Sequence, residues 1–317
     1  MIPYHFHLIW MGKKFPFVNR LAIESILQTN PEAKITLHFQ DPPDNDNWNS
    51  LKDRIEFKEI NLEELTEGIE NAEGLKKSLE GLASNYPAGR SNLYRYLILH
   101  RYGGIYADFD TLTLQSLEPL LNNRAFIGEE VVFRSNEARV QGRFHPEFLW
   151  TFPTFGLSWA LTRINSKFLA NNLGVNAFDD LLSVFWGKAK LNNAVLACEP
   201  GHPFFRRAID WIPERDPSIK FNLGPMLMND IWKEGEHLGE IRRLKPEAFY
   251  YIPPSKTVRF FAEKQYPPMP NSYMVHWCSS NEKEKAALLE REYLSQELSE
   301  SSILFHQLAQ PVIEKMP

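Results

Sequence analysis

Hydrophobic and polar residues follow a strand–helix–strand rhythm over the first 60 residues. Tyr4 to Trp10 and Lys34 to Phe39 are rich in aromatic and branched side chains, which favours strands, and Arg54 to Ile60 is a candidate third strand. Phe17 to Gln28 has the apolar spacing of a helix, which Thr29-Asn30-Pro31 ends. This rhythm predicts an α/β fold with a parallel sheet and helices packed on it.

The next segments predict further helices and one short strand. Residues 61–83 mix glutamates with leucines, as solvated amphipathic helices do. Ser91 to Tyr102 is a predicted helix with Ser91 as its N-cap and Gly103 in the left-handed position after its end. The strand Ile105-Tyr106-Ala107 then leads into Asp108-Phe109-Asp110.

The pattern loosens beyond residue 130, and no linker divides the chain. We therefore expect a single domain over 1–317 with helical or loop-rich additions. Its expected parts are a nucleotide-binding half over 1–130, a half for the acceptor and the sugar pocket over 131–290, and a C-terminal helix over 291–317.

Composition narrows the function classes. The formal net charge of −5 over 317 residues argues against a protein that binds duplex nucleic acid, which needs a basic face. Cys198 and Cys278 cannot form a disulfide framework and are expected to be reduced thiols. No apolar run is long enough to span a bilayer, and the N-terminus lacks a signal-peptide pattern. We expect a cytoplasmic protein; peripheral contact with the inner face of the membrane and a secreted effector stay open.

Asp108 and Asp110 are the strongest candidates for chemistry. Side chains alternate along an extended strand, so acids at positions i and i+2 share a face. Two carboxylates at the end of a strand can hold Mn²⁺ or Mg²⁺, which prefer oxygen ligands and leave positions free for phosphate oxygens. Such an ion would offset the charge on a leaving diphosphate.

The segment from Ser91 to Asp110 resembles a known family. Ser91-Asn92-Leu93-Tyr94-Arg95-Tyr96 and Gly103-Gly104-Ile105-Tyr106-Ala107-Asp108-Phe109-Asp110 are similar to the S-D-x-x-R-Y … G-G-x-Y-x-D-x-D block of retaining glycosyltransferases with a sugar-binding DXD region. The nearest groups are the family-32 type and the catalytic domains of large clostridial toxins. The resemblance implies a GT-A type, Rossmann-like, mostly parallel sheet flanked by helices.

Four more segments match the family in the same order. They are His7-Leu8-Ile9-Trp10-Met11-Gly12, Asn192 to Pro203 with its Pro-Gly-His-Pro end, Asn222-Leu223-Gly224-Pro225, and Val275-His276-Trp277-Cys278-Ser279. The resemblance therefore extends from residue 4 to about residue 280.

The resemblance also implies roles for individual residues. It places catalysis on Arg95, Asp108, Asp110 and Asn193. It places binding of the nucleotide-sugar donor on His7, Trp10, Ser91, Asn92, Arg95, Tyr106, Asp108 and Asn193. Trp10 would stack on the base, an interaction worth about 1–3 kcal/mol. Asp108, Asp110 and His276 would hold the metal, with Ser279 or Ser280 as alternatives to His276. His202 is expected to be structural.

Two departures from the family pattern affect these expectations. Asn92 stands where most relatives carry an aspartate, which leaves the choice of donor sugar open. Trp277 precedes the serines, where relatives place a later Ser-Trp, so the loop that closes over the diphosphate is expected to be built differently.

The implied activity is metal-dependent, retaining transfer of a hexose from a nucleotide diphosphate sugar, with UDP favoured. The acceptor would be a saccharide, a glycolipid or a protein side chain. The stretch from Arg134 to Phe155, rich in arginine and aromatic residues, is a candidate acceptor lid or a satellite core. Two alternatives stay open: a non-catalytic module that binds sugar or nucleotide, and a phosphohydrolase of the haloacid-dehalogenase type, whose motif Asp108-Phe109-Asp110-Thr111-Leu112 matches only in part.

Overall fold

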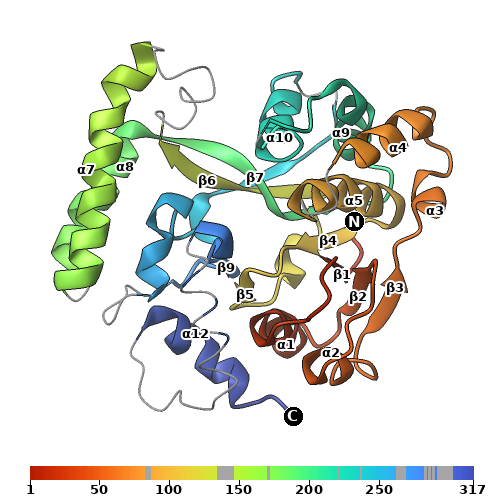
Figure 1. Ribbon diagram of the computed structural model, residues 1–317, viewed down its shortest axis with the longest axis horizontal. Coiled ribbons are helices and arrows are strands. Elements are labelled where there is room, and N and C mark those ends of the chain that lie inside the picture. Colours follow the sequence, from red (N-terminus) through yellow and green to blue (C-terminus); the bar gives the residue numbers. More distant parts are fainter. Residues whose placement is uncertain are drawn as a thin grey trace.

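A seven-stranded mixed sheet forms the centre of the computed structural model (Figure 1). Its strand order is β3-β2-β1-β4-β7-β6-β8, and a second sheet pairs β5 with β9. The structure describes residues 1–82, 87–133, 146–169, 172–219, 221–235, 238–261, 269–281 and 303–317, with Glu284, Ala287 and Glu290. The strands are β1 (His5–Trp10), β2 (Lys34–Phe39), β3 (Glu56–Glu59), β4 (Gly104–Ala107), β5 (Thr111–Thr113), β6 (Ala125–Phe133), β7 (Gly187–Cys198), β8 (Arg242–Leu244) and β9 (Met274–His276).

The pairing of these strands confirms the predicted α/β class. β1 pairs in parallel with both β2 and β4, β2 pairs in parallel with β3, and β6 does so with β8. β7 runs antiparallel between β4 and β6. The sheet is therefore mostly parallel, as expected, and the three strands predicted in the first 60 residues are neighbours in it.

Helices cover both faces of the sheet (Figure 1). α1 and α2 pack on one face of the sheet, and α5 and α9 pack on the other. Both faces carry side chains for this packing, because alternate residues of each strand point to opposite sides. The helices are α1 (Phe17–Thr29), α2 (Asp46–Asn49), α3 (Leu62–Thr66), α4 (Ala72–Gly81), α5 (Pro87–Tyr102), α7 (Pro146–Phe168), α8 (Leu173–Trp186), α9 (Pro203–Trp211), α10 (Pro225–Trp232) and α12 (Leu304–Ile313). Short 3₁₀ turns are η1 (Glu118–Leu120), η2 (Ile212–Glu214), η4 (Pro246–Ala248), η5 (Pro254–Phe261) and η6 (Ser279–Asn281).

One helix boundary differs from the prediction. α5 begins at Pro87, so Ser91 lies inside the helix and is not its N-cap. Proline is favoured in the first turn because the amide hydrogen that it lacks has no partner there. The predicted end is confirmed: Gly103 has φ +65° and its N–H donates to Leu99 O.

The chain beyond residue 130 adds helices to the same sheet. β6 runs across residue 130, so the two expected halves share one sheet. α7 and α8 form a hairpin at one margin of the molecule (Figure 1). Of the candidate lid, residues 134–145 lie outside the described residues and 146–155 begin α7. Of the expected C-terminal helix, 291–302 lie outside them, and α12 occupies its later part.

The described C-terminal segments build a third apolar cluster. Trp277 is 2% exposed and packs against Phe305 and Phe261. The tryptophan is thus part of the core, which gives a physical reason for the altered order of the C-terminal motif. No described helix is long and apolar enough to cross a membrane.

Candidate active site

Two glycines bring the first acid to the end of β4. Gly103 and Gly104 both have positive φ, and a Cβ on Gly104 would lie 2.4 Å from His5 O. Only glycine fits this approach, because a side chain would strain the backbone and clash with β1. The turn feeds α5 directly into β4. Asp108 follows, and its N–H donates to Ala194 O of β7 at 2.9 Å. This hydrogen bond fixes the backbone of the acid at the C-terminal end of β4.

Arg95 holds the Asp108 carboxylate in place. Its Nη2 lies 3.0 Å from Asp108 Oδ1, and its Nη1 lies 3.4 Å from Oδ2. Its Nε, Nη2 and Nη1 also donate to Ser91 O, Ser91 Oγ and Asn193 O, so each of the three guanidinium nitrogens has a hydrogen-bond partner. Tyr106 completes the cluster, because its hydroxyl donates to Asp108 Oδ1 at 2.6 Å and its ring lies 4.4 Å from the guanidinium. The structure thus brings Arg95, Ser91 and Tyr106 together around Asp108.

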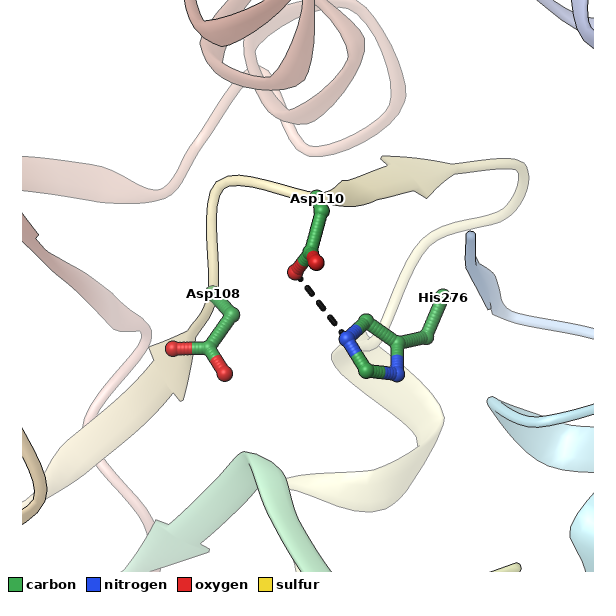
Figure 2. Close-up of side chains that lie close together, drawn as sticks. All are labelled: Asp108, Asp110 and His276. Carbon is green, nitrogen blue, oxygen red and sulfur yellow. Dashed lines mark hydrogen bonds and ion pairs between the residues drawn. The ribbon is translucent and has the colours of Figure 1, made fainter. Parts of the chain in front are cut away.

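Asp110 belongs to a second cluster, at the junction of the two sheets. His276 Nε2 lies 3.0 Å from Asp110 Oδ1 (Figure 2). The backbone N–H and the hydroxyl of Ser279 both donate to Oδ2, at 2.9 and 3.2 Å. Antiparallel pairing of β5 with β9 causes this convergence, since it sets His276 opposite Thr111. Phe109, between the acids, packs edge-on against Trp10 in the core.

The two carboxylates differ in their affinity for protons. Burial raises the pKa of Asp108, Arg95 opposes this effect, and the Asp110 charge adds to it. Burial also acts against the charge on Asp110, but His276 and Ser279 lower its pKa to about 2. Burial disfavours the imidazolium of His276, yet Cys278 and Asp110 raise its pKa well above 6.5. Asp110 and His276 are therefore a charged pair at neutral pH.

These three residues suit a divalent cation. One ligand atom from each of Asp108, Asp110 and His276 lies within 4.8 Å of the others, and Figure 2 shows the three side chains facing a common space. Each carboxylate has more acceptor positions than its present partners use. Two carboxylates and an imidazole suit Mn²⁺, provided that His276 gives up its proton. Ser279 instead contacts Asp110, and only the backbone of Ser280 is described.

A second polar group lies where three matched segments meet. Asn193 Nδ2 donates to Asn92 Oδ1 at 2.8 Å and to Tyr96 OH at 3.0 Å. Gly224 closes over both amides: a Cβ there would lie 3.2 Å from Asn92 Nδ2 and 3.3 Å from Asn193 Nδ2. Tyr96 in turn donates to Leu223 O. The amide oxygen of Asn193 has no donor among the described residues, which leaves it able to accept from a ligand hydroxyl.

Trp10 and His7 lie apart from these clusters. The Trp10 ring, at the end of β1, contacts Phe15 and Phe109 edge-on, and its buried Nε1 has no hydrogen-bond partner among the described residues. His7 is buried, and its Nδ1 lies 3.0 Å from His38 Nε2. The structure therefore does not bring His7 to the acids. His202 caps α9, in keeping with the structural role expected of it.

The structure adds residues that sequence reasoning missed. Cys278 Sγ lies 3.2 Å from His276 Nδ1, and the i, i+2 spacing of the two residues is a sequence feature that could have indicated this contact. Glu130 is 6% exposed on β6, burial raises its pKa, and its Oε2 has no partner among the described residues. Nothing in the local sequence sets Glu130 apart, because Glu129 beside it is an ordinary partly exposed acid.

Solved structures with a similar course of the chain are glycosyltransferases. The "PaToxG" glycosyltransferase is 13% identical, with 74% of this chain and 69% of that chain covered and a TM-score of 0.45. The UDP-bound glycosyltransferase domain from the YGT toxin is 11% identical, with 77% and 79% covered and a TM-score of 0.44. The galactosyltransferase LgtC in complex with donor and acceptor sugar analogs is 13% identical, with 86% and 87% covered and a TM-score of 0.39.

Comparison by sequence matches only part of the chain. No curated protein matches the chain. One family model matches, described as "Glycosyltransferase sugar-binding region containing DXD motif", over residues 16–127. The match includes Arg95, Asp108 and Asp110 and leaves Trp10 and His276 outside. Residues 16–127 of this chain are therefore similar to the sugar-binding region, with its DXD motif, that this family model describes.

Proposed function

We propose that the protein is a metal-dependent retaining glycosyltransferase that moves a hexose from a nucleotide diphosphate sugar, with a UDP-sugar as the favoured donor. The observation that carries the proposal is the convergence of Asp108 and Asp110, from one segment, with His276, 166 positions later in the chain than Asp110. Asp108 pairs with Arg95 and Asp110 pairs with His276, yet both carboxylates and the imidazole also face one common space, which two separate structural ion pairs do not require.

The proposed metal ligands are Asp110, His276 and Asp108, the last directly or through water. Mn²⁺ or Mg²⁺ at this position supplies a positive charge against the departing diphosphate. Ser279 orients the Asp110 carboxylate with its two hydrogen bonds. Because the second oxygen of Asp110 is held in this way, its position does not depend on His276 alone.

Arg95 is proposed to position Asp108. Its three guanidinium nitrogens all donate hydrogen bonds within the protein, so its part is to fix the orientation of this carboxylate and to supply positive charge beside it. Tyr106 and Ser91 support the same arrangement. Direct contact with the donor diphosphate, the role that the family resemblance implies for Arg95, would require it to release one of these partners.

Donor recognition is proposed to use two further places. Asn193, held by Asn92 and Tyr96, would accept a hydrogen bond from a hydroxyl of the transferred sugar. Trp10, at the end of β1, would contact the base. The proposed acceptor is a saccharide, a glycolipid or a protein hydroxyl. Its proton can pass to the departing phosphate oxygen on the same face of the sugar, so this mechanism needs no separate general base.

The anomeric configuration of the product tests the proposal. We expect nuclear magnetic resonance of the first-formed product to show the same anomer as the donor, and we expect EDTA to stop turnover. Full activity in EDTA or an inverted anomer would contradict the proposal. Release of inorganic phosphate through an aspartyl-phosphate would favour the phosphohydrolase alternative, and donor binding without turnover in the presence of acceptors would favour the binding module.

A further inference from the structure

The helical hairpin formed by α7 and α8 has its polar side chains on the inside. Ser158 and Thr162 both donate to Asp179, Thr162 at 2.6 Å, and all three are at most 2% exposed. One turn further on, Asn165 Nδ2 donates to Asn176 Oδ1 at 2.9 Å. The i, i+3 and i+4 spacing of these residues places a polar stripe between the two helices, where soluble hairpins usually bury apolar residues.

The same polar stripe joins the hairpin to the rest of the molecule. Arg259 of η5 donates to Asp179 Oδ2 at 2.7 Å and to Asp180 Oδ1 at 2.9 Å. Lys256, which is fully buried, lies 3.1 Å from Asp179 and 2.8 Å from Asp180. Asp179 and Asp180 of α8 thus face the cations of η5. These ion pairs determine the orientation of the hairpin and therefore the side that faces outward.

The outward side is apolar. Eight of the twelve large apolar side chains that are exposed among the described residues lie between positions 152 and 181. Trp159 is 49% exposed and Phe168 is 70% exposed. The others are Phe152, Leu157, Ile164, Leu169, Phe178 and Leu181. Five of the eight lie on α7, where helical spacing sets them away from Ser158, Thr162 and Asn165, and we call these five the hairpin face: Phe152, Leu157, Trp159, Ile164 and Phe168. Figure 1 shows α7 at one margin of the molecule. Such a concentration marks a surface that is covered in use.

The charges beside the hairpin face are positive. Arg163 lies over the Trp159 ring at 4.8 Å, and Lys167 lies over the Phe168 ring at 5.2 Å. From Phe152 to Phe168 the sequence contains these two cations and no acid, although the whole chain carries a net charge of −5. Aromatic rings beside lysine and arginine are the composition of helices that lie in the headgroup layer of an anionic membrane.

We propose that the hairpin face docks on an anionic phospholipid surface, with the axis of α7 in the plane of the membrane. A second copy of the chain fits less well. A twofold interface on this face would bring the cations of both copies together, whereas phosphate headgroups would neutralise them. The inference rests on the exposure and charge of the hairpin and is independent of the proposed transferase activity.

Vesicle sedimentation of the full chain tests the proposal. Phosphatidylcholine vesicles with and without phosphatidylglycerol are the probes. We expect the protein to sediment with the vesicles that contain phosphatidylglycerol and to stay largely in solution with phosphatidylcholine alone. Trp159→Ser combined with Phe168→Ser should weaken the partition about tenfold, because two large half-exposed side chains no longer enter the interface. Lys167→Glu should weaken it about 30-fold, because the charge is both lost and reversed at about 1 kcal/mol for each step.

Trp232→Ser is the matched control. Trp232 is 37% exposed with Arg243 over its ring at 4.9 Å, so it has the same kind of pair outside the hairpin. We expect its partition to equal that of wild type, and we expect the hairpin variants to keep the wild-type melting temperature. Three results would each overturn the proposal. The first is equal binding of wild type to both vesicle types, and the second is an equal loss of binding in Trp232→Ser. The third is a wild-type protein that does not bind vesicles but forms a concentration-dependent dimer, which the hairpin variants abolish.

Discussion

The Asp110 carboxylate stabilises the metal-free fold through its charge. Its pKa is about 2, against an ordinary value of 3.8, which corresponds to about 2 kcal/mol of preference for the charged form. Asp110→Asn removes this charge in a side chain of nearly the same shape. It also relieves Asp108, whose pKa the Asp110 charge raises. We therefore expect a net loss of about 1–2 kcal/mol in the free energy of unfolding at pH 7.

Urea denaturation in EDTA measures this loss. Because the folded pKa is depressed, the contribution is complete above the unfolded pKa near 4 and disappears as the pH falls toward 2. The contribution of the Asp110 charge to the difference between wild type and Asp110→Asn should thus be present at pH 7 and shrink as the pH falls from about 4 toward 2. In a chain of this length it corresponds to about 2–3 °C in melting temperature.

Asp210→Asn provides the control. Asp210 accepts from Arg206 at 2.9 Å in an i, i+4 pair on the surface, and such pairs contribute about 0.3–0.5 kcal/mol. An Asp110→Asn protein as stable as wild type, or more stable, would refute the reasoning. It would mean that the repulsion between the two acids equals or exceeds the gain from His276 and Ser279.

Three further predictions concern the same site. Arg95→Lys should lower the rate of turnover about 100-fold or more, because a lysine ammonium cannot replace the planar guanidinium and Asp108 loses its orientation. Arg101→Lys is the control: Arg101 pairs with Glu67 at the surface, and its replacement should leave turnover unchanged. Mn²⁺ at about 100 times its dissociation constant should raise the melting temperature by about 4 °C, EDTA should reverse the rise, and a rise retained in Asp110→Asn would contradict the assignment of the site. Affinity for Mn²⁺ should increase with pH, because His276 has a raised pKa and must lose its proton to bind the metal. Calorimetry should show that the Mn²⁺ affinity of His276→Gln depends less on pH than that of wild type. The same pH dependence in both proteins would remove His276 from the metal ligands.

The first strands and the Asp-x-Asp site could be predicted because both depend on local pattern. Aromatic and branched side chains identify β1 and β2 as strands, and the glycine pair before β4 requires a turn. The strand alternation expected of the two acids is not what aligns them, because β4 ends at Ala107 and Phe109 and Asp110 lie in a turn. Asp110 is instead held by His276 and Ser279, while Phe109 packs against Trp10.

Contacts between distant segments could not be derived from local pattern. The hydrogen bonds of the Arg95 guanidinium depend on Ser91, Asp108 and Asn193, which only the folded chain brings together. Pairing of β5 with β9 sets His276 beside Asp110 across 166 positions. The resemblance to glycosyltransferases suggested His276, but it did not predict that Cys278 and Ser279 would hold the pair.

The helix boundary at α5 shows a different limit. Ser91 has the residue type of an N-cap, and local propensity alone places it there. In the structure its hydroxyl contacts Tyr106 OH and Arg95 Nη2 inside the site. A residue that looks like a cap can thus be recruited to a buried polar cluster, and its role is visible only once the partners are in place.

Nucleotide release from donor sugars is the most direct test of the central claim. A panel of UDP- and GDP-sugars, with and without Mn²⁺, is incubated with wild type and with Asp110→Asn. We expect slow release of one nucleotide diphosphate from one donor, only with the metal, and a loss of about 100-fold or more in the variant. Release at the full rate in EDTA, or equal release by Asp110→Asn, would contradict it. Absence of release together with absence of nucleotide binding in calorimetry would remove the donor site itself.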